Sequence, residues 1–106
     1  MVRLPIGVAE SGNGYIKFPD GTLIQWGAYY TEDASVEMQI TFPCHFVDSN
    51  YSISYCKYWY VHGYYLVFWS EAIDGIKAKP MKTNGDESIE KGAIIGGRWM
   101  AVGRWK

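Results

Sequence analysis

Hydrophobic and polar residues alternate singly along several short segments of the chain, which is the period of a β-strand. The clearest case is the segment 36–42, whose hydrophobic members are Val36, Met38, Ile40 and Phe42 and whose polar members are Glu37, Gln39 and Thr41. This alternation predicts a strand with one side facing the core and one side facing solvent. Pro43 is expected to end it, because proline has no N–H group to donate to a neighbouring strand.

The segments 15–18 and 22–30 predict a β-hairpin joined by the sequence PDG at 19–21. Each residue of this connection favours a turn, because proline presets φ, aspartate can bond the neighbouring backbone and glycine tolerates positive φ. Within the second strand, the two-residue period places three side chains on one face: Ile24, Trp26 and Ala28. We expect this face to pack against the core, with Trp26 as a buried ring.

The rest of the chain continues the strand pattern and shows no sustained helical period. Further strands are predicted over 51–60, 64–69, 75–81 and 98–105, and a polar loop over 82–92. We therefore expect an all-β fold, a small β-sandwich-like domain of roughly seven mostly antiparallel strands. Residues 1–13 are interpreted as a lead-in or connector, and residues 14–106 as a single domain.

The segment 64–69, YYLVFW, is hydrophobic on both faces. A strand of this kind is either central in a sandwich or covered by another subunit. A lone domain of 106 residues also leaves roughly a third of its chain surface exposed. The sequence thus favours association of several copies.

Composition and charge exclude several classes of function. The formal net charge is −1 with the signs interspersed, so no nucleic-acid partner is expected. No apolar run approaches the roughly 20 residues that a membrane helix needs, and the first residues lack the apolar core of a signal peptide, so no membrane insertion is expected. Cys44 and Cys56 are too few for a disulfide framework, and we expect free thiols in a protein made in a reducing cytosol.

No combination of residues in the sequence points to catalysis or to a bound metal. Cys44 and His45 are adjacent, so on a strand they would point to opposite faces instead of forming a dyad. The two cysteines and two histidines match no zinc spacing. Three acidic pairs stand in predicted loops, where solvated charge is their ordinary role: Glu32 with Asp33, Glu71 with Asp74, and Asp86 with Glu87. We expect no enzyme activity, no cofactor and no metal site.

Aromatic residues are concentrated between Tyr51 and Trp69, in numbers that a small core cannot turn inward entirely. One interpretation is that they form the core and a subunit interface. The other is a ligand surface, because tyrosine and tryptophan combine a flat apolar face with a polar tip, which suits sugar rings. The candidates for receptor or glycan binding flank the tight connection 61–63, and they are Tyr58, Trp59, Tyr60, His62, Tyr64 and Tyr65. The 82–92 loop is the next choice.

Three ordered motifs resemble the C-terminal receptor-binding domain of tail fibres from tailed phages and prophages, and of the related fibres of phage-tail-like bacteriocins. The first is NGYIKFPDGTLIQWG at 13–27, the second is ITFPCHFVDSNYSISY at 40–55, and the third is RWMAVGRWK at 98–106. Together they extend over nearly the whole chain. The aromatic segment 55–69 and the loop 82–92 are not part of the family pattern, so variation that suits different hosts is expected there.

The resemblance implies a homotrimeric, β-rich tip at the distal end of a virion tail fibre, synthesised in the cytoplasm of the bacterial host. It implies binding of a bacterial surface receptor, often a polysaccharide such as lipopolysaccharide or capsule, without catalytic residues. The motif residues Gly14, Pro19, Gly21, Trp26 and Gly27 would then shape a scaffold hairpin, with recognition elsewhere. Two alternatives stay open: a structural trimerisation cap, and a glycan depolymerase, against which the missing carboxylate constellation counts.

Overall fold

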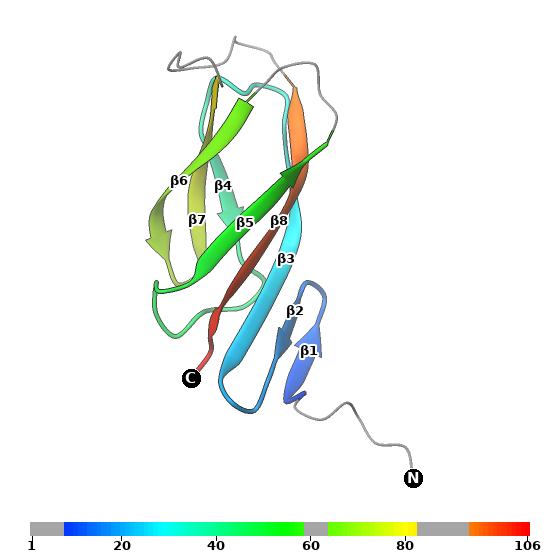
Figure 1. Ribbon diagram of the computed structural model, residues 1–106, viewed down its shortest axis with the longest axis vertical. Coiled ribbons are helices and arrows are strands. Elements are labelled where there is room, and N and C mark those ends of the chain that lie inside the picture. The colour runs from blue at the N-terminus through cyan, green and yellow to red at the C-terminus, as the bar shows by residue number, and fades with distance from the viewer. Residues whose placement is uncertain (1–7, 59–63, 83–93) are drawn as a thin grey trace.

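The computed structural model describes residues 8–58, 64–82 and 94–106, and within these ranges the chain is all β (Figure 1). Eight strands lie in the described ranges: β1 (Glu10–Gly12), β2 (Tyr15–Lys17), β3 (Thr22–Thr31), β4 (Met38–Thr41), β5 (Ser52–Lys57), β6 (Tyr64–Ala72), β7 (Gly75–Lys82) and β8 (Ile95–Arg104). The all-β prediction is confirmed. The strand that was not expected, β1, lies in the segment 1–13 that was interpreted as a lead-in.

The strands form two antiparallel sheets arranged as a sandwich (Figure 1). The larger sheet has the order β1-β2-β3-β8-β5, and the smaller sheet has the order β4-β7-β6. β8 pairs with β3 along its whole length, from Thr22 opposite Arg104 to Thr31 opposite Ile95. The larger sheet is therefore held together by pairing between segments that are far apart in the sequence.

The hairpin predicted at the start of the domain is confirmed as β2 and β3. Gly21 has a φ of 100°, and its N–H donates to the Phe18 carbonyl across the turn at 3.0 Å. The Asp20 carboxylate accepts a hydrogen bond from the N–H of Thr22 at 2.8 Å. This is the local bond for which aspartate is favoured in such turns, so the sequence PDG specifies the turn directly.

The buried face of β3 is the opposite of the one predicted. Leu23, Gln25 and Tyr29 are buried between the sheets, whereas the Trp26 side chain is 41% exposed on the outer face. The prediction of Trp26 as a core ring was therefore wrong. The two-residue period was correct, but both faces of β3 carry apolar residues, and the buried face includes a glutamine.

The segment 64–69 is not central in the sandwich, since β6 is an edge strand of the smaller sheet. Its inner residues Tyr64 and Leu66 are buried, and its outer residues Tyr65 and Val67 are exposed in the single chain. The central-strand alternative is therefore wrong, and coverage of the outer face by another subunit stays a prediction. Both cysteines are free, as predicted.

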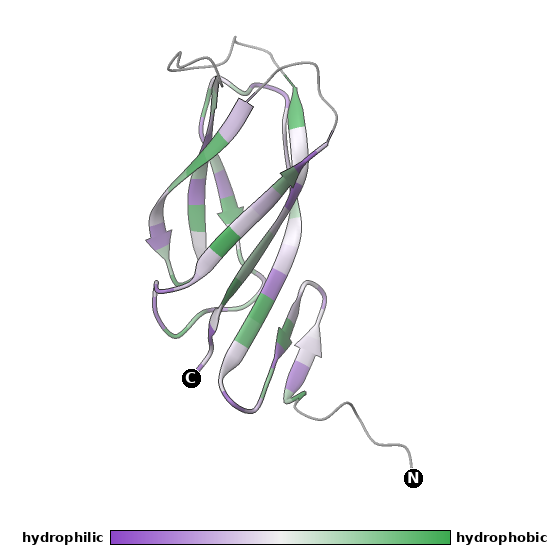
Figure 2. Ribbon diagram, viewed as in Figure 1, coloured by the Kyte–Doolittle hydropathy of each residue, from purple (hydrophilic) through white to green (hydrophobic). Residues whose placement is uncertain are grey.

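Aromatic rings fill one part of the core, and hydrophobic positions recur along both sheets (Figure 2). Phe42, Phe46 and Tyr51 contact one another with ring centroids 5.2, 5.1 and 4.6 Å apart, and Phe42 also meets Trp99 at 5.4 Å. Ring pairs at these separations add to the stability that burial provides. Phe42 directly follows β4, which ends at Thr41, and Phe46 lies four residues further along. Both are buried, so the FPxxF motif contributes to the core.

Candidate functional site

The connections between strands define two ends of the sandwich. β3, β5 and β7 run toward one end, where β4, β6 and β8 begin, and β1 lies toward the other end together with the C-terminus (Figure 1). We call the end that lies away from β1 the distal end. Loops carried on a rigid β scaffold are common binding sites, so the distal end is the first place to look for one.

Tyr58 directly follows β5 and keeps its backbone paired, since its N–H donates to the Gly96 carbonyl at 3.0 Å. Its side chain is exposed, and its hydroxyl accepts a hydrogen bond from the Arg98 guanidinium at 3.0 Å. Arg98 stands opposite Ala28 on β3, on the face that also carries Trp26. Tyr58 therefore presents its ring on the outer face of the larger sheet.

Tyr64 points the other way, into the core. Its side chain is buried, and its hydroxyl shares a hydrogen bond of 2.8 Å with the hydroxyl of Tyr29. Burial, together with this bond, raises the pKa of Tyr29 far above its usual range, so the pair stays neutral. The Nζ atom of Lys57 donates to the Tyr64 carbonyl at 2.8 Å. Tyr64 thus has a structural role and does not offer its ring to a ligand.

Tyr65, the next residue along β6, is 41% exposed on the outer face of the smaller sheet. Tyr58 and Tyr65 therefore lie on opposite outer faces of the sandwich, and the structure does not bring the two rings together. Trp59, Tyr60 and His62, the other predicted members of the site, lie outside the described residues. Most of the 82–92 loop, the second choice, lies outside them as well.

A groove of about 540 Å³ runs between the edges of β3 and β4, at the side where one sheet gives way to the other. It exists because β2 is short: the last β2–β3 pair joins Tyr15 to Gln25, so the second half of β3 has no strand along that edge among the described residues. Asn13, Gly14 and Pro43 are among its lining residues. The sequence analysis missed this groove, because the residue pattern of β3 does not indicate where its neighbouring strand ends.

The groove offers backbone hydrogen-bonding groups. The N–H of Trp26 donates toward β2, to the Gly14 carbonyl at 3.0 Å, so by alternation Ala28 directs its N–H and carbonyl to the same side. On β4, the N–H of the following Phe42 donates toward β7, so Thr41 directs its backbone groups away from β7 and into the groove. A groove lined by such backbone donors and acceptors can bind an extended polymer, either a peptide or a glycan.

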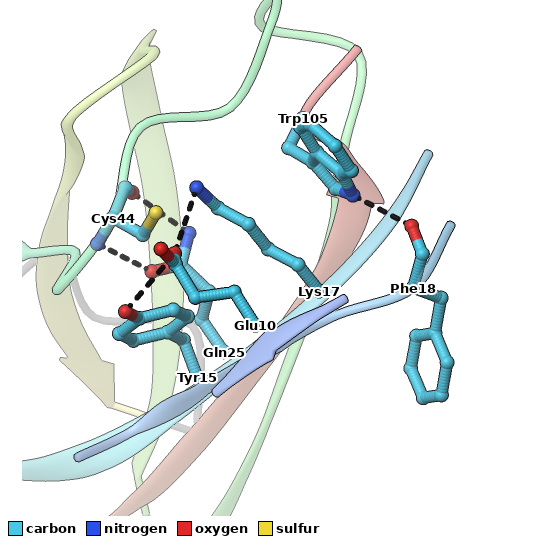
Figure 3. A network of polar contacts seen from close by, with 7 residues as sticks. All are labelled: Glu10, Tyr15, Lys17, Phe18, Gln25, Cys44 and Trp105. Atoms are coloured by element: carbon cyan, nitrogen blue, oxygen red, sulfur yellow. Dashed lines mark hydrogen bonds and ion pairs between the residues drawn. The ribbon is translucent and has the colours of Figure 1, made fainter. Parts of the chain in front are cut away.

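The hairpin is linked by a buried glutamine to the segment that follows β4. Gln25 is 0% exposed, and its side-chain amide donates to the Cys44 carbonyl at 2.9 Å while its amide oxygen accepts from the Cys44 N–H at 2.8 Å (Figure 3). Both ends of this polar side chain are thereby satisfied inside the fold. Nothing in the sequence singled out Gln25, because its partner is a backbone segment nineteen residues away.

A second set of contacts fixes the outer strands of the hairpin (Figure 3). The Glu10 carboxylate accepts a hydrogen bond from the Tyr15 hydroxyl at 3.1 Å and pairs with the Lys17 ammonium, also at 3.1 Å. The lysine, and after it the tyrosine, lowers the pKa of Glu10 below its usual value. The Trp105 indole donates to the Phe18 carbonyl at 2.8 Å, which attaches the C-terminal segment. These contacts support a scaffold role for the hairpin.

The acidic pairs that the sequence singled out do not form a site within the described ranges. Asp33 accepts hydrogen bonds from the N–H and the hydroxyl of Ser35 at 3.0 and 2.6 Å, and Glu71 and Asp74 are exposed beside the β6–β7 turn. Within residues 8–58, 64–82 and 94–106, no three histidine, cysteine or acidic side chains gather as a metal site would require. Over the same ranges, no helix is long and apolar enough to cross a membrane.

Comparison with protein families identifies a matching family. The model of the family described as "Putative tail fiber protein gp53-like, C-terminal" matches residues 17–104. This chain belongs to that family of tail fibre C-terminal domains. The resemblance seen in the three motifs is thereby confirmed, and it places the domain at the tip of a virion fibre. Searches of curated proteins and of solved structures found no match.

Proposed function

We propose that this fibre domain is the part that recognises the host, and that it binds a glycan of the bacterial surface, such as lipopolysaccharide or capsule, without altering it chemically. The observation that carries the proposal is the exposure of Tyr58 and Tyr65 toward the distal end, away from β1. A C-terminal domain follows the rest of the fibre along the chain. The distal end then points away from the fibre and toward the cell.

The exposed rings have the chemistry that sugar binding needs. A tyrosine ring stacks its apolar face on the C–H groups of a sugar, while the hydroxyl at its tip can bond the hydroxyl groups around it. Since Tyr58 and Tyr65 lie on opposite outer faces, one short saccharide meets one of them, and only a longer chain crossing the distal end meets both. Trp59, Tyr60 and His62 stand between them in the sequence and stay part of the proposed site.

We also propose that the domain works as a homotrimer. Single sugar-stacking contacts are weak, and three copies of one site facing the same surface gain from effective concentration. This arrangement needs no new contact to raise the overall affinity by about 10²–10⁴. A structural trimerisation cap, the alternative function, shares this assembly but predicts no binding to cells.

Staining of a panel of bacterial strains with the fluorescently labelled chain tests recognition. We expect strain-specific staining that is competed by purified surface polysaccharide from the stained strain, with no release of sugar fragments. Absence of staining on every strain would favour the cap, and release of fragments would favour a depolymerase. Either result would contradict the proposal.

Matched variants test the site. Tyr65→Ala should reduce staining several-fold, whereas Val67→Ala, which is equally exposed two residues further along the same face, should not. Tyr58→Phe keeps the ring and loses only the exposed bond to Arg98, so it should stain like the parent while Tyr58→Ala does not. Unchanged staining by both alanine variants, with unchanged melting, would place the receptor site elsewhere.

A further inference from the structure

The outer face of the larger sheet carries an apolar patch at its centre. The register of β3 and β8 places Ile24 opposite Val102 and Trp26 opposite Met100. On β2, Ile16 stands opposite Ile24 and extends the same row. We call these five side chains the apolar patch. Trp26, Met100 and Val102 are 41%, 47% and 40% exposed in the single chain, so the apolar groups are open to solvent.

Charged residues border this patch but do not enter it. Arg98 stands on the same face of β8 two residues before Met100, and Arg104 stands there two residues after Val102. On the neighbouring strand β5, the residues opposite Val102 and Met100 are Ser52 and Ser54. An apolar centre with small polar neighbours and a charged rim is the composition of a protein interface.

The outer face of the smaller sheet is built differently. Lys77 and Lys79 lie on β7, and Lys77 stands opposite Gln39 and forms an ion pair with Glu37 at 3.8 Å. Val67 on β6 stands opposite Lys79. Apolar side chains are exposed on this face only at the edge strand β6, as Tyr65 and Val67, whereas the central strand β7 is polar. In the larger sheet the apolar residues lie instead on the two central strands, β3 and β8.

The surface beside the patch is hollowed, so a side chain of a partner can fit into it. A hollow of about 400 Å³ lies beside it, and its lining includes Trp26, Ser54, Cys56, Arg98 and Met100. All five side chains belong to the outer face according to the strand register. A projecting apolar side chain of a partner would fill this hollow and lose its own contact with water.

The size of the patch fits the centre of a subunit interface. From the exposed fractions of Trp26, Met100 and Val102, with Ile16 and Ile24 half-buried, the five side chains present on the order of 300 Å² of apolar surface. A stable interface covers about 800 Å² on each partner and has a polar rim around its apolar centre. The remaining area is supplied by the same face, where Ala28 and Tyr30 on β3 are also exposed.

The geometry points to this patch as the surface through which copies of the chain associate, with their larger sheets facing a common axis. The apolar centre of this face has no polar pattern with which to select a foreign partner, whereas identical copies always bring matching apolar centres. The smaller sheets then face solvent, and with them the outer face of β6, which the sequence had led us to expect under another subunit. The distal ends lie side by side. The inference rests on the proposed homotrimer and names its contact surface.

A charge placed in the patch tests the inference. In Met100→Glu the new carboxylate lies on the same face as Arg98, so the isolated chain tolerates it, but copies facing each other would bury like charges. We expect the parent to be an oligomer at micromolar concentration by light scattering. The concentration for half-dissociation should rise at least about 100-fold in Met100→Glu.

The matched control is Val67→Glu on the other outer face. Val67 is 40% exposed, like the patch residues, and its new carboxylate would stand opposite Lys79. This variant should keep the mass of the parent. A monomeric parent, or a Met100→Glu variant that keeps the mass of the parent, would overturn the inference. These measurements need no receptor, so their failure is distinct from failure to stain cells, and an oligomer of another order would contradict the trimer alone.

Cys56 supplies a second measurement that does not depend on how Met100→Glu folds. Its thiol is exposed in the single chain and lines the hollow beside the patch. In a Cys44→Ser chain it is the only thiol, so its rate of labelling reports on this face alone. We expect labelling of the native oligomer to be at least about tenfold slower than in denaturant. Equal rates would overturn the inference.

Discussion

Replacing Gln25 by leucine removes the buried link between the hairpin and the segment after β4. Leucine fills nearly the same space, so the change deletes hydrogen bonds without opening a large cavity. Two bonds are lost, one to the Cys44 carbonyl at 2.9 Å and one from the Cys44 N–H at 2.8 Å. The backbone groups of Cys44 are then left without their partners.

The expected cost follows from the burial of these groups. Leaving a buried backbone group unsatisfied costs about 1–3 kcal/mol. Cys44 is only half-buried, so water can reach its backbone in part, and the lower end of the range applies to each bond. The sum for Gln25→Leu is about 2–3 kcal/mol. For a domain of this size, that corresponds to a fall in melting temperature of about 10 °C.

Thermal melting followed by circular dichroism, with urea unfolding as a second measurement, checks this value. All chains are compared at one protein concentration, because association makes the melting temperature depend on concentration. Gln39→Leu is the control, since Gln39 is exposed and its side chain bonds only to the adjacent Ile40 carbonyl at 3.1 Å. If Gln25→Leu melts within about 2 °C of Gln39→Leu, the buried amide does not tie the hairpin to the core.

Three further predictions concern stability. Trp26→Ala should cost about 1–2 kcal/mol in urea unfolding of the monomer, below the 3–5 kcal/mol of a fully buried ring, and a larger loss would contradict its outer position. Tyr29→Phe should cost about 1 kcal/mol at pH 7. The raised pKa of Tyr29 makes the parent lose stability as pH rises above about 10, and the variant should show a shallower slope. The pKa of Glu10 is lower in the folded state, so its contribution to stability is present above the unfolded pKa and is lost as pH falls through the folded pKa. In Glu10→Gln this contribution is absent. The urea midpoint of the variant should therefore fall less steeply than that of the parent as pH is lowered into the acid range.

The predicted binding residues show what strand periodicity can and cannot determine. The sequence placed a run of rings around one connection, and alternation alone implied that they divide between two faces. It could not say that Tyr64 would meet Tyr29 in the core, because that contact joins residues thirty-five positions apart. Nor could it separate Tyr58 from Tyr65, since β5 and β6 belong to different sheets.

Local chemistry was decided by the sequence itself. The PDG turn forms because the proline, aspartate and glycine each satisfy a requirement of the few atoms around them, with Gly21 at a φ of 100°. The strands follow from the two-residue period, and the end of β4 follows from Pro43. The three motifs were likewise sufficient to identify the family that the comparison established.

Tertiary structure decided which side of each strand is inside. On β3, the period predicts two faces but not which one meets the other sheet. The face with Gln25 can be buried because the backbone groups of Cys44 satisfy both ends of the amide. The groove depends on where β2 stops, and the apolar patch depends on the β3–β8 register, which aligns Trp26 with Met100. These features arise from pairing between distant segments, so no local pattern of residues carries them.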